Sequence, residues 1–317
     1  MKTLIYGAGS VGLGIASCLL KDHAAVDIIA RENTVAALRK KGLFRTGLFG
    51  DFHAPPQSFS AHTSLTEIPP ADYDYVLVCV KSFGSSNAAS DLSNHKLLLG
   101  KNPKIVLFQN GWGNAETFSS YFDSRLIYNA RVITGFRRPQ PNHVVITVHA
   151  DSIHIGSLFA APLPDIEPLC KSIAAGGIPC EKTDAIDKDL WAKMLYNCAL
   201  NPLSGILDVP YGKLAENEFT RSIMNGIVEE IFAVIAAAGY RTHWQRPADF
   251  LEIFYGKLVP DTASHKSSTL QDILAKKKIE IDALNGAVIT LAQKLRIKTP
   301  CNSTVYSILK FIETKNQ

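Results

Sequence analysis

The segment that most constrains the fold of this chain is the glycine motif close to its beginning. An apolar run, KTLIY, leads directly into GAGSVG, and a helical pattern follows. In this context the first glycine permits a tight turn, the second lets a pyrophosphate approach the backbone, and the third lets the helix pack closely against the strand. A glycine turn without a ligand is the alternative. We predict a strand–turn–helix unit that binds a dinucleotide through Gly7, Ala8, Gly9, Ser10, Val11 and Gly12.

The rest of the chain divides into two kinds of pattern. Up to about residue 183, short apolar runs such as AVDII, YVLVCV and KIVLF alternate with helical patterns, which favours a parallel sheet covered on both faces. We expect strands within residues 126–156 to extend this sheet in antiparallel fashion. Long helical patterns follow at 187–207, 216–238, 248–255, 268–295 and 303–315. The predicted fold is α/β, with an N-terminal Rossmann-type doubly wound sheet in residues 1–184 and an all-α domain in residues 185–317.

The end of the second predicted strand indicates which dinucleotide is bound. Domains that bind NAD usually place Asp or Glu there, about 20 residues after the glycines, to hold the ribose hydroxyls. This chain has Arg31, and a guanidinium suits a 2′-phosphate. We therefore expect NADPH/NADP as the cofactor. The alternative is that Glu32 binds the ribose while Arg31 is solvated.

Two more predicted strands end in polar residues, Lys81 after VLVCV and Asn110 after IVLFQ. In open α/β sheets, ligands bind beyond the carboxyl ends of the strands. Both side chains are therefore expected to face the cofactor.

The segment WAKMLYNCALNPL carries polar residues on a helix that is otherwise apolar. Lys193, Asn197 and Asn201 fall within about 80° of one another around that helix. A buried helix with such a stripe favours a polar cavity, and an ammonium beside two amides suits a small ligand with hydroxyl, carbonyl and carboxylate groups. The alternative is a lysine that extends to solvent and amides that bond to loops.

The pattern at 268–295 predicts one long helix. Glu280 borders its apolar stripe, where a carboxylate could pair with a buried cation or a substrate hydroxyl, or else form a peripheral ion pair with one of Lys276 to Lys278. Ser268 begins the pattern in STLQ, a capping box with Gln271.

Composition excludes several classes of partner. The 33 basic and 29 acidic residues give a net charge of only +4, which argues against a nucleic-acid partner. The six cysteines form no C-x-x-C motif and indicate reduced thiols of a cytoplasmic protein without a metal site. We find no signal peptide and no apolar run of membrane length, and so expect no membrane partner.

With these residues assembled, the chain resembles the ketopantoate reductase (2-dehydropantoate 2-reductase) family nearly end to end. The resemblance implies a helical domain like that of 6-phosphogluconate dehydrogenase, with the active site between the domains. It also implies NADPH-dependent reduction of 2-dehydropantoate to pantoate in pantothenate biosynthesis. The segments that carry it are GAGSVG, VCVKSFG, FQNGWGN, WAKMLYNCALNPLSGI, SSTLQD and EIDALNG.

The same resemblance implies roles for single residues. Lys193 matches the general acid, an ammonium that stabilises the charge growing on the substrate oxygen and then donates its proton. Residues that match substrate ligands are Asn197, Asn201 and Ser268, and those that match the lining of the cofactor and substrate are Lys81, Asn110 and Glu280. Glu280 is expected to orient Lys193 or the substrate.

Two departures from the family pattern leave alternatives open. Tyr211 stands where relatives often have a substrate-binding asparagine, and residues 130–135 lack a threonine-rich stretch, although Gly135 is small enough for a cofactor to pass. The chain could reduce another 2-oxo acid, or it could bind NADPH as a sensor without turnover. The expected partner is a small 2-oxo acid, and the chain could form a homodimer.

Overall fold

The structure, a computed structural model, describes residues 1–315. The chain divides into two compact units. The first comprises Met1–Gln109 and Asn114–Ile186, and the second comprises Asn110–Gly113 together with the chain from Asp187 onward. A short segment from the middle of the α/β half thus belongs to the helical unit.

The first unit is built around an eight-stranded sheet with the order β12-β11-β8-β7-β6-β1-β2-β5. The six neighbouring strands β8, β7, β6, β1, β2 and β5 are mutually parallel. Strand β11 is antiparallel to β8 and parallel to β12. Both the parallel sheet and its antiparallel extension at β11 confirm the predicted fold. The strands are β1 (Lys2–Tyr6), β2 (Ala25–Ile29), β5 (Ser60–His62), β6 (Tyr75–Val78), β7 (Lys104–Leu107), β8 (Ile127–Arg131), β11 (Ile153–Gly156) and β12 (Cys180–Lys182).

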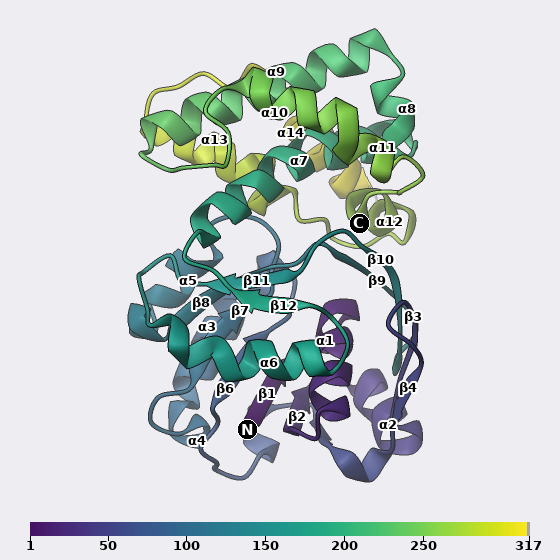
Figure 1. Ribbon diagram of the computed structural model, residues 1–317, viewed down its shortest axis with the longest axis vertical. Helices are drawn as coiled ribbons and strands as arrows, with labels where there is room; N and C mark the ends of the chain where they lie inside the picture. The colour runs from purple at the N-terminus through teal and green to yellow at the C-terminus, as the bar shows by residue number, and fades with distance from the viewer. Residues whose placement is uncertain (316–317) are drawn as a thin grey trace. The chain divides into compact units, whose positions relative to one another are not determined.

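Helices cover both faces of this sheet because successive side chains of a strand point to opposite sides. On β1, Ile5 packs with α1 (Ser10–Lys21) and α6 (Glu167–Ala175), which lie beside each other across the strands in Figure 1. Leu4 packs with the other layer, formed by α3 (Ser85–Asn94) and α5 (Asn114–Ser119). The remaining helices of this unit are α2 (Glu32–Lys41) and α4 (Lys96–Leu99).

A second, four-stranded sheet packs against α1. Its strands are β3 (Leu43–Gly47), β4 (Phe52–Ala54), β9 (Thr134–Gln140) and β10 (His143–His149), in the order β4-β3-β10-β9. The expectation that the strands of residues 126–156 extend the main sheet in antiparallel fashion is therefore wrong for β9 and β10, which do not join that sheet, and for β8, which is parallel to β7. The hairpin instead pairs through β10 with β3, and its Val144 and Ile146 share the core of α1.

The two sheets enclose α1 from both sides, so residues Gly12 to Leu20 are all buried. Close packing depends on a second helical glycine, since a Cβ at Gly14 would lie 2.4 Å from the ring of Phe136 on β9. This arrangement fixes the helix that follows the glycine motif.

In the described part of the second unit every regular element is helical, as predicted. Trp191, Leu195 and Cys198 of α7 are completely buried in its core. The elements are α7 (Ile186–Leu207), α8 (Tyr211–Ala215), α9 (Glu218–Ala237), α10 (Pro247–Ile253), a π-helical turn (Phe254–Leu258), α11 (Val259–Asp261), α12 (Ser268–Leu274), a 3-10 turn (Ile281–Ala283), α13 (Asn285–Lys294) and α14 (Pro300–Lys315).

The prediction of one long helix over 268–295 is wrong. Helix α12 ends at Leu274, and Lys276 adopts a left-handed conformation with φ of 52°. The amide of Ile279 then donates to the Glu313 carboxylate at 2.9 Å, which holds the following loop against α14. The predicted cap is also displaced by one residue, because the buried Ser267 accepts from the amide of Leu270 and caps α12.

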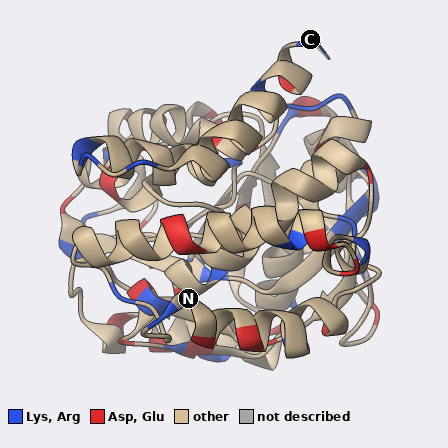
Figure 2. Ribbon diagram, turned by 90° about the horizontal axis from the view of Figure 1, so that it is seen from above, with Lys and Arg blue, Asp and Glu red and all other residues tan. Residues whose placement is uncertain are grey.

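In Figure 2 the positions of basic and acidic residues are scattered over the helices and loops. Within residues 1–315, no helix combines the length and the apolar character needed to cross a membrane.

Candidate active site

The glycines of GAGSVG have separable structural roles. Gly7 has φ of 108°, and a Cβ on Gly12 would lie 2.1 Å from the Gly7 carbonyl oxygen, so the turn itself requires both residues. A Cβ on Gly9 would meet only the Cys79 carbonyl oxygen at 3.9 Å. The backbone at Gly9 is therefore open, which is what close approach of a pyrophosphate needs.

Helix α1 begins directly after this open position. Its N-cap is Gly9, which has no side chain to cap the helix, and its first turn contains no acidic residue. The first backbone N–H groups of a helix lack intrahelical acceptors and favour an anion. The residues present thus fit the phosphates of a dinucleotide.

Arg31 is the exposed N-cap residue of α2, just after β2, and Glu32 begins the helix beside it. A residue that sequence reasoning missed lies close by. Arg138 of β9 donates from Nη1 to the carbonyl oxygen of Ala8 at 2.9 Å. The stretch FRRPQ in the sequence gives no indication that β9 reaches the glycine motif.

The two other cofactor residues predicted in the first unit occupy different settings. Lys81 is exposed and precedes the 3-10 turn Ser82–Gly84 after β6. Gly135 lies on β9, where a Cβ would approach the Thr147 hydroxyl to 2.9 Å. Packing within the small sheet is therefore sufficient to explain a glycine at position 135.

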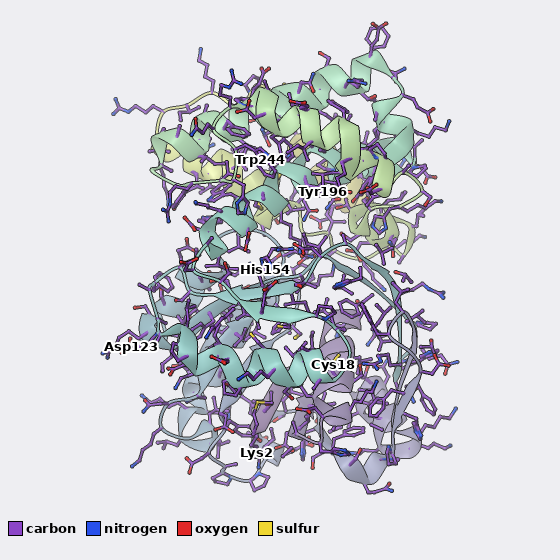
Figure 3. All side chains as sticks on the ribbon, in the orientation of Figure 1. Lys2, Cys18, Asp123, His154, Tyr196 and Trp244 are labelled. Atoms are coloured by element: carbon purple, nitrogen blue, oxygen red, sulfur yellow. The ribbon has the colours of Figure 1, made fainter. Side chains whose placement is uncertain are left out.

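The polar stripe of α7 is partly accessible. Lys193 and Asn197 are partly exposed, whereas Met194, Leu195 and the run from Cys198 to Leu200 are buried. Tyr196 shares this accessible stripe, and it is labelled among the helices of the second unit in Figure 3. Asn201 lies deeper and is buried.

Lys193, Asn110 and Glu280 form one connected group. The Lys193 ammonium donates to Asn110 Oδ1 at 2.7 Å, and the Asn110 amide nitrogen donates to Glu280 Oε2 at 3.5 Å. Glu280 is only 6% exposed, so its carboxylate is a buried group and not a peripheral one. All three residues belong to the second unit, although they come from three distant segments of the chain.

The segment Asn110–Gly113 is anchored in the helical unit by backbone and ring contacts. The Trp112 amide donates to the Ala283 carbonyl at 2.9 Å, and a Cβ on Gly111 would lie 2.4 Å from the same oxygen. The Trp112 ring packs 4.5 Å from Trp191 and 4.9 Å from Tyr240, measured between ring centroids. These contacts hold Asn110 beside Lys193.

Tyr211 contacts one of the predicted substrate ligands, Asn201, and two neighbouring rings. Its hydroxyl donates to Asn201 Oδ1, and its ring packs near Tyr196 and His265. Burial raises the pKa of Tyr196 to about 12, and the Tyr196 hydroxyl bonds to Thr262 at 2.6 Å. Ser268 is exposed at the start of α12, so its hydroxyl is not committed to capping that helix.

Within residues 1–315, no three His, Cys, Asp or Glu side chains are grouped so that they could hold a metal ion. The groups present at the α7 stripe and beside it are an ammonium, amides, hydroxyls and a buried carboxylate.

Comparison with known proteins identifies the family. Residues 3–159 match the model described as Ketopantoate reductase PanE/ApbA, and residues 185–313 match Ketopantoate reductase PanE/ApbA C terminal. The chain belongs to the ketopantoate reductase family. A 2-dehydropantoate 2-reductase of Aquifex aeolicus is 34% identical over 318 aligned residues, covering 100% of this chain and 98% of that protein. One from Pyrococcus horikoshii is 26% identical and covers 99% and 98%.

Solved structures agree with this assignment. The crystal structure of a PanE/ApbA family ketopantoate reductase from Ralstonia eutropha JMP134 has a TM-score of 0.87 at 31% identity, with 100% of both chains covered. A D-mandelate dehydrogenase with NADH and anilino(oxo)acetate also has a TM-score of 0.87, at 20% identity and with 100% and 99% of the chains covered. The second similarity extends to the fold alone.

Proposed function

We propose that this chain reduces 2-dehydropantoate to pantoate with NADPH, as a step of pantothenate biosynthesis, and that Lys193 is the proton donor. The observation that carries the proposal is the group formed by Lys193, Asn110 and Glu280. An ammonium held by an amide and backed by a buried carboxylate suits the protonation of a developing alkoxide. We infer the substrate from the names of the relatives, which are 2-dehydropantoate 2-reductases.

The chemistry divides between the cofactor and the chain's own residues. When bound, NADPH supplies a hydride to the 2-oxo carbon. Negative charge then grows on the carbonyl oxygen, which Lys193 stabilises and protonates. An ammonium carries three N–H donors, so Lys193 can hold Asn110 and a substrate oxygen at the same time. The Glu280 carboxylate favours the charged lysine and fixes the Asn110 amide.

Several residues complete the proposed binding sites. We assign the dinucleotide to residues 1–184, through Gly7 to Gly12, Arg31, Lys81 and Gly135, with Asn110 and Glu280 lining its reactive end. We assign the substrate to residues 185–317, through Asn197, Asn201 and Ser268. The exposed Arg31 guanidinium supports NADPH over NADH.

We further propose a cytoplasmic enzyme, because all six cysteines are free. We also propose that the chain forms a homodimer, and light scattering of the purified protein tests this.

The decisive experiment follows NADPH absorbance in the presence of 2-dehydropantoate and identifies pantoate by chromatography. Cofactor consumption that matches pantoate formation supports the proposal. NADPH binding without turnover of any 2-oxo acid would instead indicate a sensor.

A second substrate class is favoured by the hydrogen bond from Tyr211 to Asn201. This bond uses one of the two lone pairs of the amide oxygen and leaves it less able to accept from a substrate hydroxyl, so a 2-oxo acid without a distal hydroxyl is the alternative substrate. A panel of 2-oxo acids, assayed with the native chain and with Tyr211→Asn, separates the two. If 2-dehydropantoate is the substrate, it should give the highest kcat/KM in the panel for the native chain.

A further inference from the structure

Arg138 connects three parts of the first unit that are far apart in sequence. It lies on β9, and its Nη1 donates to the Ala8 carbonyl in the glycine motif at 2.9 Å and to the Thr34 hydroxyl in the first turn of α2 at 3.4 Å. Residue 138 as a whole is exposed, although its guanidinium lies against these two groups. Arg138 therefore stands at the solvent-open junction of the glycine motif and α2.

Arg31 stands at the same junction. Its carbonyl oxygen accepts from the amides of Thr34 and Val35, which makes it the residue on which the first turn of α2 is built. Burial, and then the positive charge of Arg31, lower the pKa of Arg138. Both arginines therefore belong to this junction, Arg138 through its guanidinium bond to Thr34 and Arg31 through the backbone on which α2 begins.

Like charges that lie close together disfavour each other, and an anion bound near them favours the charged form of both. In a Rossmann-type domain, the adenosine ribose lies between the glycine motif and the end of the second strand. Both hydrogen bonds of Arg138 use Nη1, and among residues 1–315 its Nε and Nη2 donate no hydrogen bond to the protein. Those groups are available for a phosphate, which a guanidinium binds through two parallel bonds.

We propose that Arg138, with Arg31, binds the 2′-phosphate of NADPH, and that this pair of guanidinium groups sets the preference for NADPH over NADH. The inference rests on the proposed function, because it needs a nicotinamide dinucleotide in the glycine motif. It adds a residue contributed by the small second sheet, which the cofactor fingerprint of the glycine motif and second strand does not include.

A purely structural role makes a different prediction. If Arg138 only fixes the glycine motif through the Ala8 carbonyl, its loss should weaken NADPH and NADH equally, because both share the pyrophosphate. If Arg138 binds the 2′-phosphate, the loss should weaken NADPH alone. The ratio of the two dissociation constants therefore separates the roles.

The experiment measures Kd for NADPH and for NADH by nicotinamide fluorescence, without substrate. The variants are Arg138→Gln, Arg31→Gln, and the control Arg137→Gln, which changes an exposed arginine of the same strand. Arg138→Gln should raise the Kd for NADPH by about 10- to 100-fold, the range of a lost charged hydrogen bond, and leave the Kd for NADH within about twofold. Arg137→Gln should leave both unchanged, and thermal melting confirms folding of each variant.

Each remaining outcome overturns a specific statement. Equal weakening of NADPH and NADH in Arg138→Gln would assign Arg138 a structural role. If Arg138→Gln left both dissociation constants unchanged while Arg31→Gln raised the Kd for NADPH alone, the inference would be overturned but NADPH would stay as the cofactor. A native chain that binds NADPH no more tightly than NADH would overturn both the cofactor assignment and the inference.

Discussion

Lys193 Nζ lies 2.7 Å from Asn110 Oδ1, although 83 positions separate the two residues in sequence. The bond joins the centre of α7 to the segment after β7, and the same asparagine bonds to Glu280. One amide therefore links the only two charged groups of the proposed catalytic set. Its oxygen faces the cation and its nitrogen faces the carboxylate, so the amide orientation agrees with both charges.

Replacing Lys193 should remove the proton donor without disturbing cofactor binding. For Lys193→Ala we expect kcat to fall about 100-fold or more, with the Kd for NADPH unchanged, because the ammonium acts on the substrate oxygen. Steady-state kinetics and fluorescence titration measure the two quantities. Lys188→Ala, on the same helix, is the control and should retain kcat. Retention of kcat by Lys193→Ala as well would remove Lys193 from the mechanism.

Glu280 should act through Lys193 and not independently of it. We expect Glu280→Gln to lower kcat about tenfold, and Lys193→Ala/Glu280→Gln to be no slower than Lys193→Ala alone, because residues of one network are not additive. The control is Asp282→Asn, which changes an exposed carboxylate bonded to Tyr306 and Lys310. Additive losses in kcat would show that Glu280 has a separate role.

The glycines of the motif should respond differently to the same substitution. Gly12→Ala places a Cβ 2.1 Å from the Gly7 carbonyl, so we expect a strongly lowered melting temperature or no folded protein. Gly9→Ala meets only an atom at 3.9 Å and should lower the melting temperature by no more than about 5 °C. Its methyl group would instead occupy the space for the pyrophosphate and raise the Kd for NADPH about tenfold or more. A Gly9→Ala variant that binds NADPH normally would contradict this assignment.

His265 should make the stability of the protein sensitive to acid. Burial lowers its pKa from 6.5, so in the folded chain it resists the proton that the unfolded chain takes up. The unfolding free energy should therefore fall as the pH drops below about 6.5 and stop falling below the folded-state pKa. We expect the melting temperature of His265→Gln to fall less than that of the native chain when the pH is lowered from about 7.5 to about 5.5.

The exposed His23, changed to Asn, provides the matched control for the acid experiment. His149, whose pKa burial also lowers, should keep part of the native pH dependence in His265→Gln. Identical pH profiles for the native chain and His265→Gln would exclude His265 as a source of acid sensitivity.

Continuous apolar runs were sufficient to predict the parallel strands β1, β2, β6 and β7, because such runs occur mainly in sheets covered on both faces. The small sheet was not predictable in the same way. Its strand β3 reads LFRTG and buries Arg45 completely, with Nη1 donating to the Gly176 carbonyl at 2.9 Å. A charged residue at an interior position makes a strand hard to predict from sequence. The burial of Arg45 is explained only by its distant acceptor, the Gly176 carbonyl.

For the candidate site, helical spacing alone indicated that Lys193, Asn197 and Asn201 share a stripe. The prediction for Glu280 had a wrong premise, since the residue lies in a loop and not on a helix, yet its burial was anticipated. Periodicity could not reveal that a left-handed Lys276 breaks the helix. Arg138 was missed because its position depends on pairing and packing between distant segments.

The assignment of Asn110–Gly113 to the helical unit bears on how this protein can be dissected. A fragment that starts at Asp187 would lack the amide that accepts from Lys193 and the indole that packs on Trp191. The complementary fragment would keep that loop with nothing to anchor it. Recombining such halves with those of a relative would therefore also exchange part of the proposed catalytic group. Chimeras joined near residue 186 would inherit a mismatched loop unless positions 110–113 are transferred as well.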